Sequence, residues 1–530
     1  MSDRPNIVLI LNDDMGYSDL GCYGGEVATP TLDRLASNGI RFTQFYNTAR
    51  CCPSRASLLT GLHPHQTGVG HMMGDDGIDG YRGDLNDRCA TIAEALGEHG
   101  YRNYMSGKWH ISRHISPDGP KHSWPLQRGF DRYFGIITGA ANYWSPRTLT
   151  RGNTQLELND LPDDFFLTDA ISDEAAGYVR DHAADGGDDP FFMYVAYTAP
   201  HWPLHAHEED IARYEGRFAD GWDILRDDRL ARMRRMDILK EEWALTPRDA
   251  SQLPWTEAER RAWNQRRMEA YAAQIDRMDQ GIGRIVEALE ASGQLENTLI
   301  MFLADNGGCA EELGGRARTR DRDSHIATAR TRQDGKLVYH GNDPSIMPGP
   351  ETTYQSYGVP WANVSNTPFR LYKHWTHEGG IATPFIAHWP SGFESRGELR
   401  HQPGQLTDVM ATCLEASGAS YPETLGGREI LPLEGRSLLP IFHNNDNGKE
   451  AFYWEHEGNR AVRQGNWKLV NRHPGGWELY DIEADRTEMR DLSSDRPEIA
   501  RELGMLWDAW ARRCNVYPWA DLQELRRSRR

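Results

Sequence analysis

The sequence lacks any long uninterrupted run of apolar residues over its 530 positions. A helix that spans a bilayer needs about 20 consecutive apolar residues, so we expect no membrane-spanning segment and no membrane partner. The first apolar run begins at Asn6, which leaves no room before it for a secretory signal peptide. We therefore expect a cytoplasmic protein.

Cysteine is scarce, and its spacing excludes the common cysteine-based sites. The chain has no Cys-x-x-Cys pair, which is the spacing expected for a zinc or redox site. The cysteines are odd in number and scattered, so we expect free thiols rather than a disulfide framework. The seven are Cys22, Cys51, Cys52, Cys89, Cys309, Cys413 and Cys514.

An excess of positive charge is also missing, since the formal net charge is −19. An acidic surface repels polyanions, which argues against nucleic acid as a partner and weakly against long sulfated polysaccharides. One Arg-rich stretch weakens the argument against sulfated polysaccharides, because it is a candidate rim over a pocket. The aromatic segment 354–361 is a second candidate rim. Alternation with Asp, Thr and Ser nevertheless favours a solvated, salt-bridged loop. The stretch contains Arg316, Arg318, Arg320, Arg322, Arg330 and Arg332.

Two apolar runs that are present end in acidic residues. A buried strand that delivers carboxylates at its C-terminal end is typical of an α/β site. Three carboxylates and one amide oxygen form a hard, oxygen-only ligand set, which favours Ca²⁺ or Mg²⁺ over zinc. The same residues can also cap a helix or form a plain turn. The runs cover residues 6–11 and 298–303, and the polar residues after them are Asp13, Asp14, Asp305 and Asn306.

The most informative segment reads Cys-Cys-Pro-Ser-Arg-Ala-Ser-Leu-Leu-Thr-Gly at residues 51–61. Without further context, Pro53 indicates the start of a helix whose thiols fill small gaps. The segment also resembles the one by which type I sulfatases mark a cysteine for oxidation, with Pro two positions on and Arg four positions on. Only Cys51 has that spacing, because the matching positions after Cys52 hold Ser54 and Ala56.

The resemblance to type I sulfatases, in particular to the arylsulfatase-like branch of the alkaline phosphatase superfamily, extends over most of the chain. In that family the matching carboxylates and amide hold a divalent cation, usually Ca²⁺, with Mg²⁺ or another ion as the alternative. The matching basic residues hold the sulfate and the modified side chain. The implied metal ligands are Asp13, Asp14, Asp305 and Asn306, and the implied catalytic residues are Cys51, Arg55, Lys108, His110, His201 and Lys373.

The resemblance also implies the chemistry. A maturation enzyme as partner would convert Cys51 into formylglycine, which hydrates to a diol whose hydroxyl attacks the sulfur of a small sulfate ester. His201, assisted by Lys373, would protonate the leaving oxygen, and Asp305 could accept the proton of the attacking hydroxyl. His110 would then take a proton from the second hydroxyl, so that sulfate leaves and the aldehyde returns.

Two other functions stay open on the sequence alone. The same residues could hydrolyse phosphonate monoesters or phosphodiesters, because sites of this superfamily bind tetrahedral anions of sulfur and phosphorus alike. Ser54 favours the sulfatase, since the phosphonate hydrolases depart from Pro-Ser-Arg at this point. If Cys51 stayed a thiol, the chain would be a non-catalytic binding protein. The sequence leaves the formation of a homo-oligomer open.

The expected fold is α/β, with a large mixed central sheet sandwiched by helices, as in alkaline phosphatases. An apolar stripe from Met268 to Leu289 predicts a helix before the second acidic strand end. We assign residues 1–445 to a catalytic domain, in which residues 204–262 are predicted to be a helical insertion.

The C-terminal residues 446–530 are predicted to form a smaller subdomain. Short alternating segments between Gly and Pro turns indicate an antiparallel sheet from residue 452 to residue 480. Residues 497–510 are predicted to form a closing helix, and the basic tail 526–530 is expected to be solvated.

Overall fold

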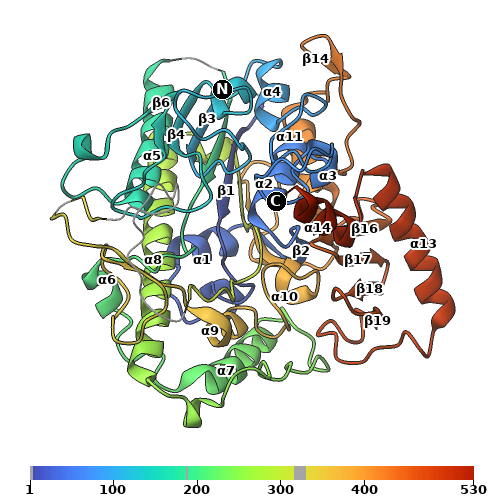
Figure 1. Cartoon of the computed structure of the whole chain (residues 1–530). Helices are drawn as coiled ribbons and strands as arrows, with labels where there is room; N and C mark the ends of the chain where they lie inside the picture. The colour runs from blue at the N-terminus through green and yellow to red at the C-terminus, as the bar shows by residue number, and fades with distance from the viewer. Residues whose placement is uncertain (1–3, 187–188, 315–329, 333, 530) are drawn as a thin grey trace.

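The computed structural model describes residues 4–186, 189–314, 330–332 and 334–529. Among these residues, eleven strands form a central mixed sheet (Figure 1). Their order is β12 (Glu398–Arg400), β2 (Ile40–Tyr46), β11 (Ala382–His388), β8 (Thr298–Ala304), β1 (Asn6–Asn12), β7 (Phe191–Ala196), β3 (Arg102–Gly107), β4 (Arg132–Ile136), β5 (Leu149–Arg151) and β6 (Thr154–Gln155), with β13 (Gly404–Gln405) beside β2. β1 runs parallel to β7 and β8, whereas β11 runs antiparallel to β2 and β8. The predicted mixed sheet is confirmed.

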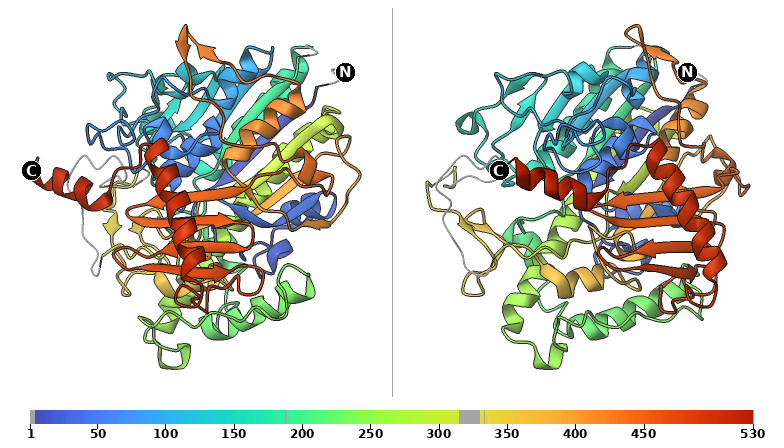
Figure 2. Two further views of the ribbon diagram at one scale, coloured as in Figure 1. Left: turned by 90° about the vertical axis from the view of Figure 1, so that its right-hand side faces the viewer. Right: turned by 45° about the vertical axis from the view of Figure 1, so that its right-hand side comes forward.

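Helices cover both faces of this sheet (Figure 2). The first group is α1 (Pro30–Ser37), α5 (Leu167–Ala184) and α8 (Arg261–Ala291), and the second is α2 (Cys51–Thr60), α4 (Ile92–Gly97) and α11 (Thr407–Ser417). Val8 and Ile10 of β1 share a core with the first group, while Ile7 and Leu9 share a core with the second. Successive residues of a strand point to opposite faces, so the central strands are apolar on both sides. The helix predicted from the apolar stripe is α8.

Shorter elements fill the loops between these layers. Residues 204–262 contain α6 (Glu208–Ala212) and α7 (Gly221–Arg235) and none of the strands of the central sheet, while the domain boundaries themselves stay a prediction. The remaining elements before residue 446 are α3 (Pro64–Thr67), α6 (Glu208–Ala212), α7 (Gly221–Arg235), β9 (Tyr339–His340), β10 (Thr353–Tyr354), α9 (Gly358–Ser365), α10 (Glu378–Ile381), β14 (Thr424–Leu425), β15 (Arg428–Glu429) and α12 (Leu439–Phe442).

The C-terminal residues form the predicted antiparallel sheet. Its strands are β16 (Ala451–His456), β17 (Asn459–Gln464), β18 (Trp467–Asn471) and β19 (Trp477–Asp481), and α13 (Pro497–Arg513) closes it. Leu469 and Leu479 of the sheet pack against Leu503 and Trp507 of α13. The right-hand view of Figure 2 shows this helix lying across the sheet.

In the basic tail, Arg527, Ser528 and Arg529 are exposed, as expected, whereas Arg526 is partly buried. Residues Trp519–Ser528 form a further helix, α14. The Arg526 guanidinium lies 2.6 Å from a carboxylate oxygen of Asp76, and it packs over the ring of Trp519. No local pattern indicates this contact, because Asp76 lies 450 positions away along the chain. Residue 530 lies outside the described residues.

Two absences expected from the sequence can be examined in the structure. All seven cysteines are free thiols, as predicted. Within the described ranges, no helix is both long and apolar enough to cross a membrane.

A buried ion network attaches the C-terminal sheet to the central core. Glu378 of α10 lies 2.8 Å from Lys468 of β18 and 2.9 Å from Arg486, and Lys468 also lies 2.8 Å from Glu488. All four side chains are fully buried. Burial raises the pKa of the Glu378 carboxyl, but the charges of Lys468 and Arg486 outweigh this effect and lower the pKa to about 2. Glu378 therefore serves the junction of the two sheets.

The substitution Glu378→Gln tests this junction. Removing one member of a buried ion pair leaves an uncompensated charge, so we expect a loss of about 3–5 kcal/mol in the free energy of unfolding, measured by urea denaturation. The ionised Glu378 stabilises the fold above its unfolded pKa of 4.5, and this contribution is lost as the pH falls toward 2. As the pH falls from 4.5 toward 2, the free energy of unfolding should therefore decrease less in the variant than in the wild type.

The control for this experiment is Glu290→Gln, which removes an exposed carboxylate that pairs with Arg34. Exposed pairs contribute about 0–1 kcal/mol, so this variant should unfold close to the wild type. Equal effects of the two substitutions would contradict the role given to Glu378.

Candidate active site

The two acidic strand ends predicted from the sequence meet in the structure. β1 and β8 are neighbouring parallel strands in the register Asn12 to Ala304, so the residues after them emerge side by side. Asn306 donates an amide hydrogen bond of 2.8 Å to Asp14. Asp14 has a φ of 67°, a conformation that is uncommon for residues other than glycine and that often marks functional sites. All of the predicted metal ligands, Asp13, Asp14, Asp305 and Asn306, are buried.

Several oxygens in this group have no hydrogen-bond donor within the described residues. They are Asp13 Oδ1, Asp14 Oδ2 and Asn306 Oδ1. Buried oxygens in proteins are nearly always satisfied, and an ion is one of the few explanations for several that are not. Carboxylate and amide oxygens are the ligands that Ca²⁺ and Mg²⁺ prefer. The donor set therefore fits a hard divalent cation.

Three basic side chains compensate the buried carboxylates. Arg55 donates to Asp305 Oδ2 from Nη2 at 2.8 Å and from Nε at 3.1 Å. Lys373 Nζ lies 2.7 Å from Asp14 Oδ1, and Lys108 forms an ion pair with Asp13. The sequence had grouped these cations at one site, and the structure brings them together.

The charges of this group also set its protonation. Burial raises the pKa of the Asp13 carboxyl, but the neighbouring cations, Lys108 foremost, outweigh burial and lower the pKa to about 2. Of these three cations, only Lys373 lines the adjacent cavity, whereas Arg55 and Lys108 do not. The structure thus separates cations that hold the carboxylates from one that can contact a ligand.

Cys51 begins α2, as the Pro53 signal predicted. Its position places it at the positive end of the helix dipole, and Arg55 lies one turn further along. Hydrogen bonding from the Cys52 thiol, followed by the charges of Lys108 and Lys373, lowers the pKa of the Cys51 thiol well below its ordinary value. Cys51 lines a cavity of about 510 Å³, and Cys52 does not. The two neighbouring cysteines therefore have different surroundings.

Both predicted histidines line the same cavity. His110 follows β3, and its Nε2 lies 3.2 Å from the sulfur of Cys52. Burial, reinforced by the charge of Lys108, lowers the pKa of His110 to about 4. A Cβ at position 139 would lie 2.2 Å from the His110 ring, so only glycine fits there.

His201 follows β7 and lies beside the acidic group. Its Nε2 lies 3.4 Å from both Asp14 Oδ2 and Lys373 Nζ. Its Nδ1 lies 2.6 Å from the carbonyl oxygen of Trp202, which fixes the ring orientation. His201 and Lys373 can therefore contact the same ligand atom.

Sequence reasoning missed most of the cavity wall. Arg50 lies 2.7 Å from Glu311, and Trp202 donates to the other oxygen of Glu311 at 3.1 Å. Apolar side chains form much of the remaining wall. These apolar side chains come from loops, so they show no helical or strand periodicity in the sequence. Among them, only Trp202 directly follows a predicted site residue, His201. The apolar lining residues are Met72, Met73, Ile115, Ala140 and Trp202.

The described residues include parts of the two predicted rims. Arg316 to Arg322 lie outside the described residues. Arg330 is exposed, as expected for a solvated loop, whereas Arg332 is partly buried and donates to the carbonyl oxygens of Leu161 and Pro162. In the segment 354–361, Tyr354 packs against Trp202 with ring centroids 5.8 Å apart. This segment therefore supports the cavity wall from behind.

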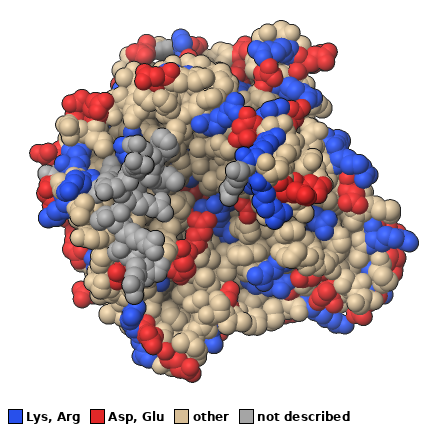
Figure 3. All heavy atoms as spheres, in the orientation of Figure 1, with Lys and Arg blue, Asp and Glu red and all other residues tan. Residues whose placement is uncertain are grey.

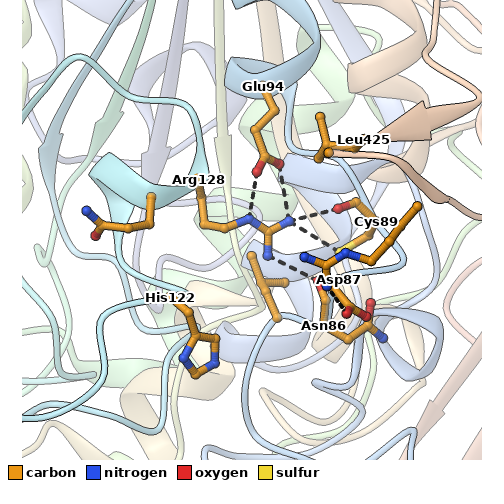
Figure 4. Close-up of a pocket in the computed structure, with 11 residues that line it drawn as sticks. Asn86, Asp87, Cys89, Glu94, His122, Arg128 and Leu425 are labelled. Atoms are coloured by element: carbon orange, nitrogen blue, oxygen red, sulfur yellow. Dashed lines mark hydrogen bonds and ion pairs between the residues drawn. The ribbon is translucent and has the colours of Figure 1, made fainter.

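A second cavity, of about 540 Å³, surrounds Arg128 (Figure 4). The guanidinium is already satisfied, with Nε 3.0 Å from Glu94 and Nη2 2.8 Å from the carbonyl oxygen of Cys89. None of the predicted catalytic or metal-binding residues lines this cavity. Its geometry indicates a structural ion pair under an open surface.

Comparison with known proteins agrees with the site. A family model described as Sulfatase matches residues 5–419, and one described as N-sulphoglucosamine sulphohydrolase, C-terminal, matches residues 369–506. The arylsulfatase of Klebsiella aerogenes is 32% identical over 472 residues, which cover 83% of this chain and 92% of the relative. An uncharacterized sulfatase of Schizosaccharomyces pombe is 31% identical over 497 residues, which cover 88% and 86%.

Solved structures show the same relationship. The crystal structure of Ps i-CgsB superposes with a TM-score of 0.67 at 26% identity, covering 96% of this chain and 93% of the other. The same protein has been solved in complex with k-i-k-neocarrahexaose. The Sulfatase model matches well over half of the chain, and the chain therefore belongs to the sulfatase family of sulfuric ester hydrolases.

Proposed function

We propose that this sulfatase hydrolyses aryl sulfate-like monoesters with a nucleophile made from Cys51 and a Ca²⁺ ion held by the buried oxygens. One observation carries the proposal. Cys51, at the N-terminus of α2, shares a cavity with His110, His201 and Lys373, and the acidic group with unpaired oxygens lies beside it. The nucleophile and the acid–base groups thus line one cavity, and the cation ligands lie beside it.

Two groups would supply chemistry that unmodified side chains cannot supply. Cys51 carries its thiol in this structure, and the thiol marks where the formylglycine made by a maturation enzyme would stand and supply a hydroxyl nucleophile. A divalent cation on Asp13, Asp14, Asp305 and Asn306 would supply Lewis acidity that lowers the pKa of that hydroxyl.

The remaining steps belong to this chain's own residues. Arg55 holds Asp305 through two hydrogen bonds to Oδ2, so that Oδ1, which accepts a 3.4 Å hydrogen bond from the backbone N–H of Asp14, is the oxygen left for the cation site. Lys373 positions the sulfate oxygens by charge, and His201 beside it donates a proton to the leaving oxygen. His110 is neutral at pH 7 because burial lowers its pKa, so it can accept a proton from the second hydroxyl.

The cavity wall favours an ester with an apolar body. Met72, Met73, Ile115 and Trp202 present hydrocarbon and ring surface to the space beyond the reacting groups. Such a wall suits an aryl group better than a sugar with many hydroxyls. The described part of the face in Figure 3 carries interspersed acidic and basic side chains, which also fits a small substrate better than a long polyanion.

The leaving-group series of His201→Ala tests this function. We expect the wild type to hydrolyse both 4-nitrophenyl sulfate and an alkyl sulfate. Without a general acid, kcat/KM for the alkyl sulfate should fall about 10²–10⁴-fold, because its alkoxide is a poor leaving group. The nitrophenyl ester should lose much less, since its phenolate leaves without a proton.

Two comparisons complete this experiment. His207→Ala removes a nearby ring that does not line the cavity, and it should change both substrates equally. Equal losses for His201→Ala would contradict its role as the acid. If kcat/KM were higher for bis(4-nitrophenyl) phosphate than for either sulfate, the main activity would be phosphodiester hydrolysis and the proposed aryl sulfate substrate would be wrong.

The cation site is tested by Asn306→Ala. This change removes one unpaired oxygen and the hydrogen bond that orients Asp14, so we expect Ca²⁺ affinity to fall by about 10–100-fold, and turnover to fall in parallel. Calorimetric titration of EGTA-treated protein measures the affinity directly. Asn38→Ala, which alters an exposed amide at the end of α1, is the matched control. Unchanged Ca²⁺ affinity in Asn306→Ala would remove Asn306 from the ligand set.

A further inference from the structure

A cluster of imidazoles and one carboxylate lies where the C-terminal sheet meets the core, separate from the acidic group described above. His374 directly follows Lys373, His456 ends β16, and Glu457 begins the turn into β17. His71 approaches from the loop after α3. The His374 and His71 rings lie against the His456 ring with centroids 5.5 and 5.7 Å away.

The donor atoms of three of these residues converge. One ring nitrogen each of His374 and His456 and one oxygen of Glu457 lie within 4.8 Å of one another. His374 Nδ1 is 3.1 Å from Glu457 Oε2, and His456 Nε2 is 3.9 Å from Oε1. Zinc binds imidazole and carboxylate at about 2.0–2.2 Å, so the donors need to move by less than about 1 Å to surround one ion.

His456 points to a missing ligand. The ring is fully buried, and in the described part of the chain neither of its nitrogens has a hydrogen-bond partner. A buried polar group without a partner is unfavourable, and such groups usually mark an ion or a water.

The surrounding contacts orient the carboxylate. Arg526 donates to His71 Nδ1 at 3.1 Å, which leaves the N–H of His71 on Nε2, 2.6 Å from Glu457 Oε1. A carboxylate that ligates a metal is commonly held in this way by an outer donor. The α14 helix, absent from the expected fold, supplies the arginine.

One contact must change when an ion binds. The Asn459 amide nitrogen lies 3.3 Å from His374 Nε2, which has to carry the ring proton once Nδ1 is a ligand. The same amide also donates to the carbonyl oxygen of His456 at 3.0 Å, so it keeps a partner after the change.

We propose that His374, His456 and Glu457 form a second metal site, which takes a transition-metal ion of the Zn²⁺ class and ties the C-terminal sheet to the loop that carries Lys373. Two imidazoles and one carboxylate are the ligands that Zn²⁺ accepts, with a water in the fourth position. The oxygen-only group beside Cys51 prefers Ca²⁺, so the chain offers two sites of different chemical hardness.

Three other clusters of the described residues could bind the same ion and have to be distinguished. One of them, Asp13, Asp14 and His201, belongs to the proposed Ca²⁺ site, which the excess Ca²⁺ keeps occupied. Cys52 and His110 belong to the active site, where a thiolate could ligate zinc. Asp84, His114 and His122 also converge, but the Arg113 guanidinium donates to His114 at 3.2 Å and places a positive charge beside that site. That charge opposes a cation.

The experiment is a calorimetric titration of the full-length protein with Zn²⁺ in excess Ca²⁺, repeated with Co²⁺ and read by absorption. We expect one tight Zn²⁺ per chain and a Co²⁺ spectrum without a sulfur charge-transfer band. His374→Asn and Glu457→Gln, which alter partly exposed side chains, should weaken Zn²⁺ binding by more than about 100-fold. His71→Gln should weaken it by about 10–100-fold through the lost outer contact.

Controls separate this site from the other clusters. His443→Asn changes an exposed histidine outside every cluster, and it should leave the Zn²⁺ affinity unchanged, as should His122→Asn and Cys52→Ser. Absence of Zn²⁺ binding to the Ca²⁺-loaded wild type would overturn the proposal. It would also be overturned if binding survived both His374→Asn and Glu457→Gln, or were lost in His122→Asn or Cys52→Ser.

Discussion

The arrangement of this protein depends on the burial of three carboxylates at the ends of two neighbouring strands. Asp13, Asp14 and Asp305 are almost completely inaccessible, and charges in such surroundings are tolerated only when they are paired. Arg55, Lys108 and Lys373 provide the pairing from three separate segments of the chain. Asp13 Oδ1 and Asp14 Oδ2 have no hydrogen-bond donor among the described residues, and a divalent cation would satisfy such oxygens. The same electrostatic requirement therefore builds the core of the site and creates its demand for metal.

The layered fold explains how distant segments meet that requirement. β1 and β8 deliver the acids, β3 and β7 deliver Lys108 and His201 at the same edge, and α2 begins there with Cys51. Carboxyl ends of parallel strands are the usual place for a ligand in such a sheet. The C-terminal sheet joins through the Glu378 network, whose α10 follows closely after Lys373. The stability of that junction and the position of Lys373 are thus linked through a short stretch of chain.

Much of this could be predicted from the sequence because the signals are local. The strands before Asp13 and Asp305 are continuous apolar runs, α8 shows a helical stripe, and Cys51 stands in a spaced motif. Other features depend on contacts between remote residues that no local pattern reports. The Arg50–Glu311 pair, the apolar wall and the Arg526–Asp76 pair of α14 are of this kind. The imidazole cluster around His456 likewise joins four positions spread over nearly four hundred residues.

The central claim is that the reactive group of this sulfatase is made from Cys51 and not from its neighbour. Both thiols are buried, but only Cys51 faces the cavity. The most direct test is peptide mass spectrometry across residues 51–55 of material from the native host. The account predicts the mass of an aldehyde or its hydrate at position 51, with Cys52 still a thiol. Intact thiols at both positions, or an aldehyde at position 52, would contradict it.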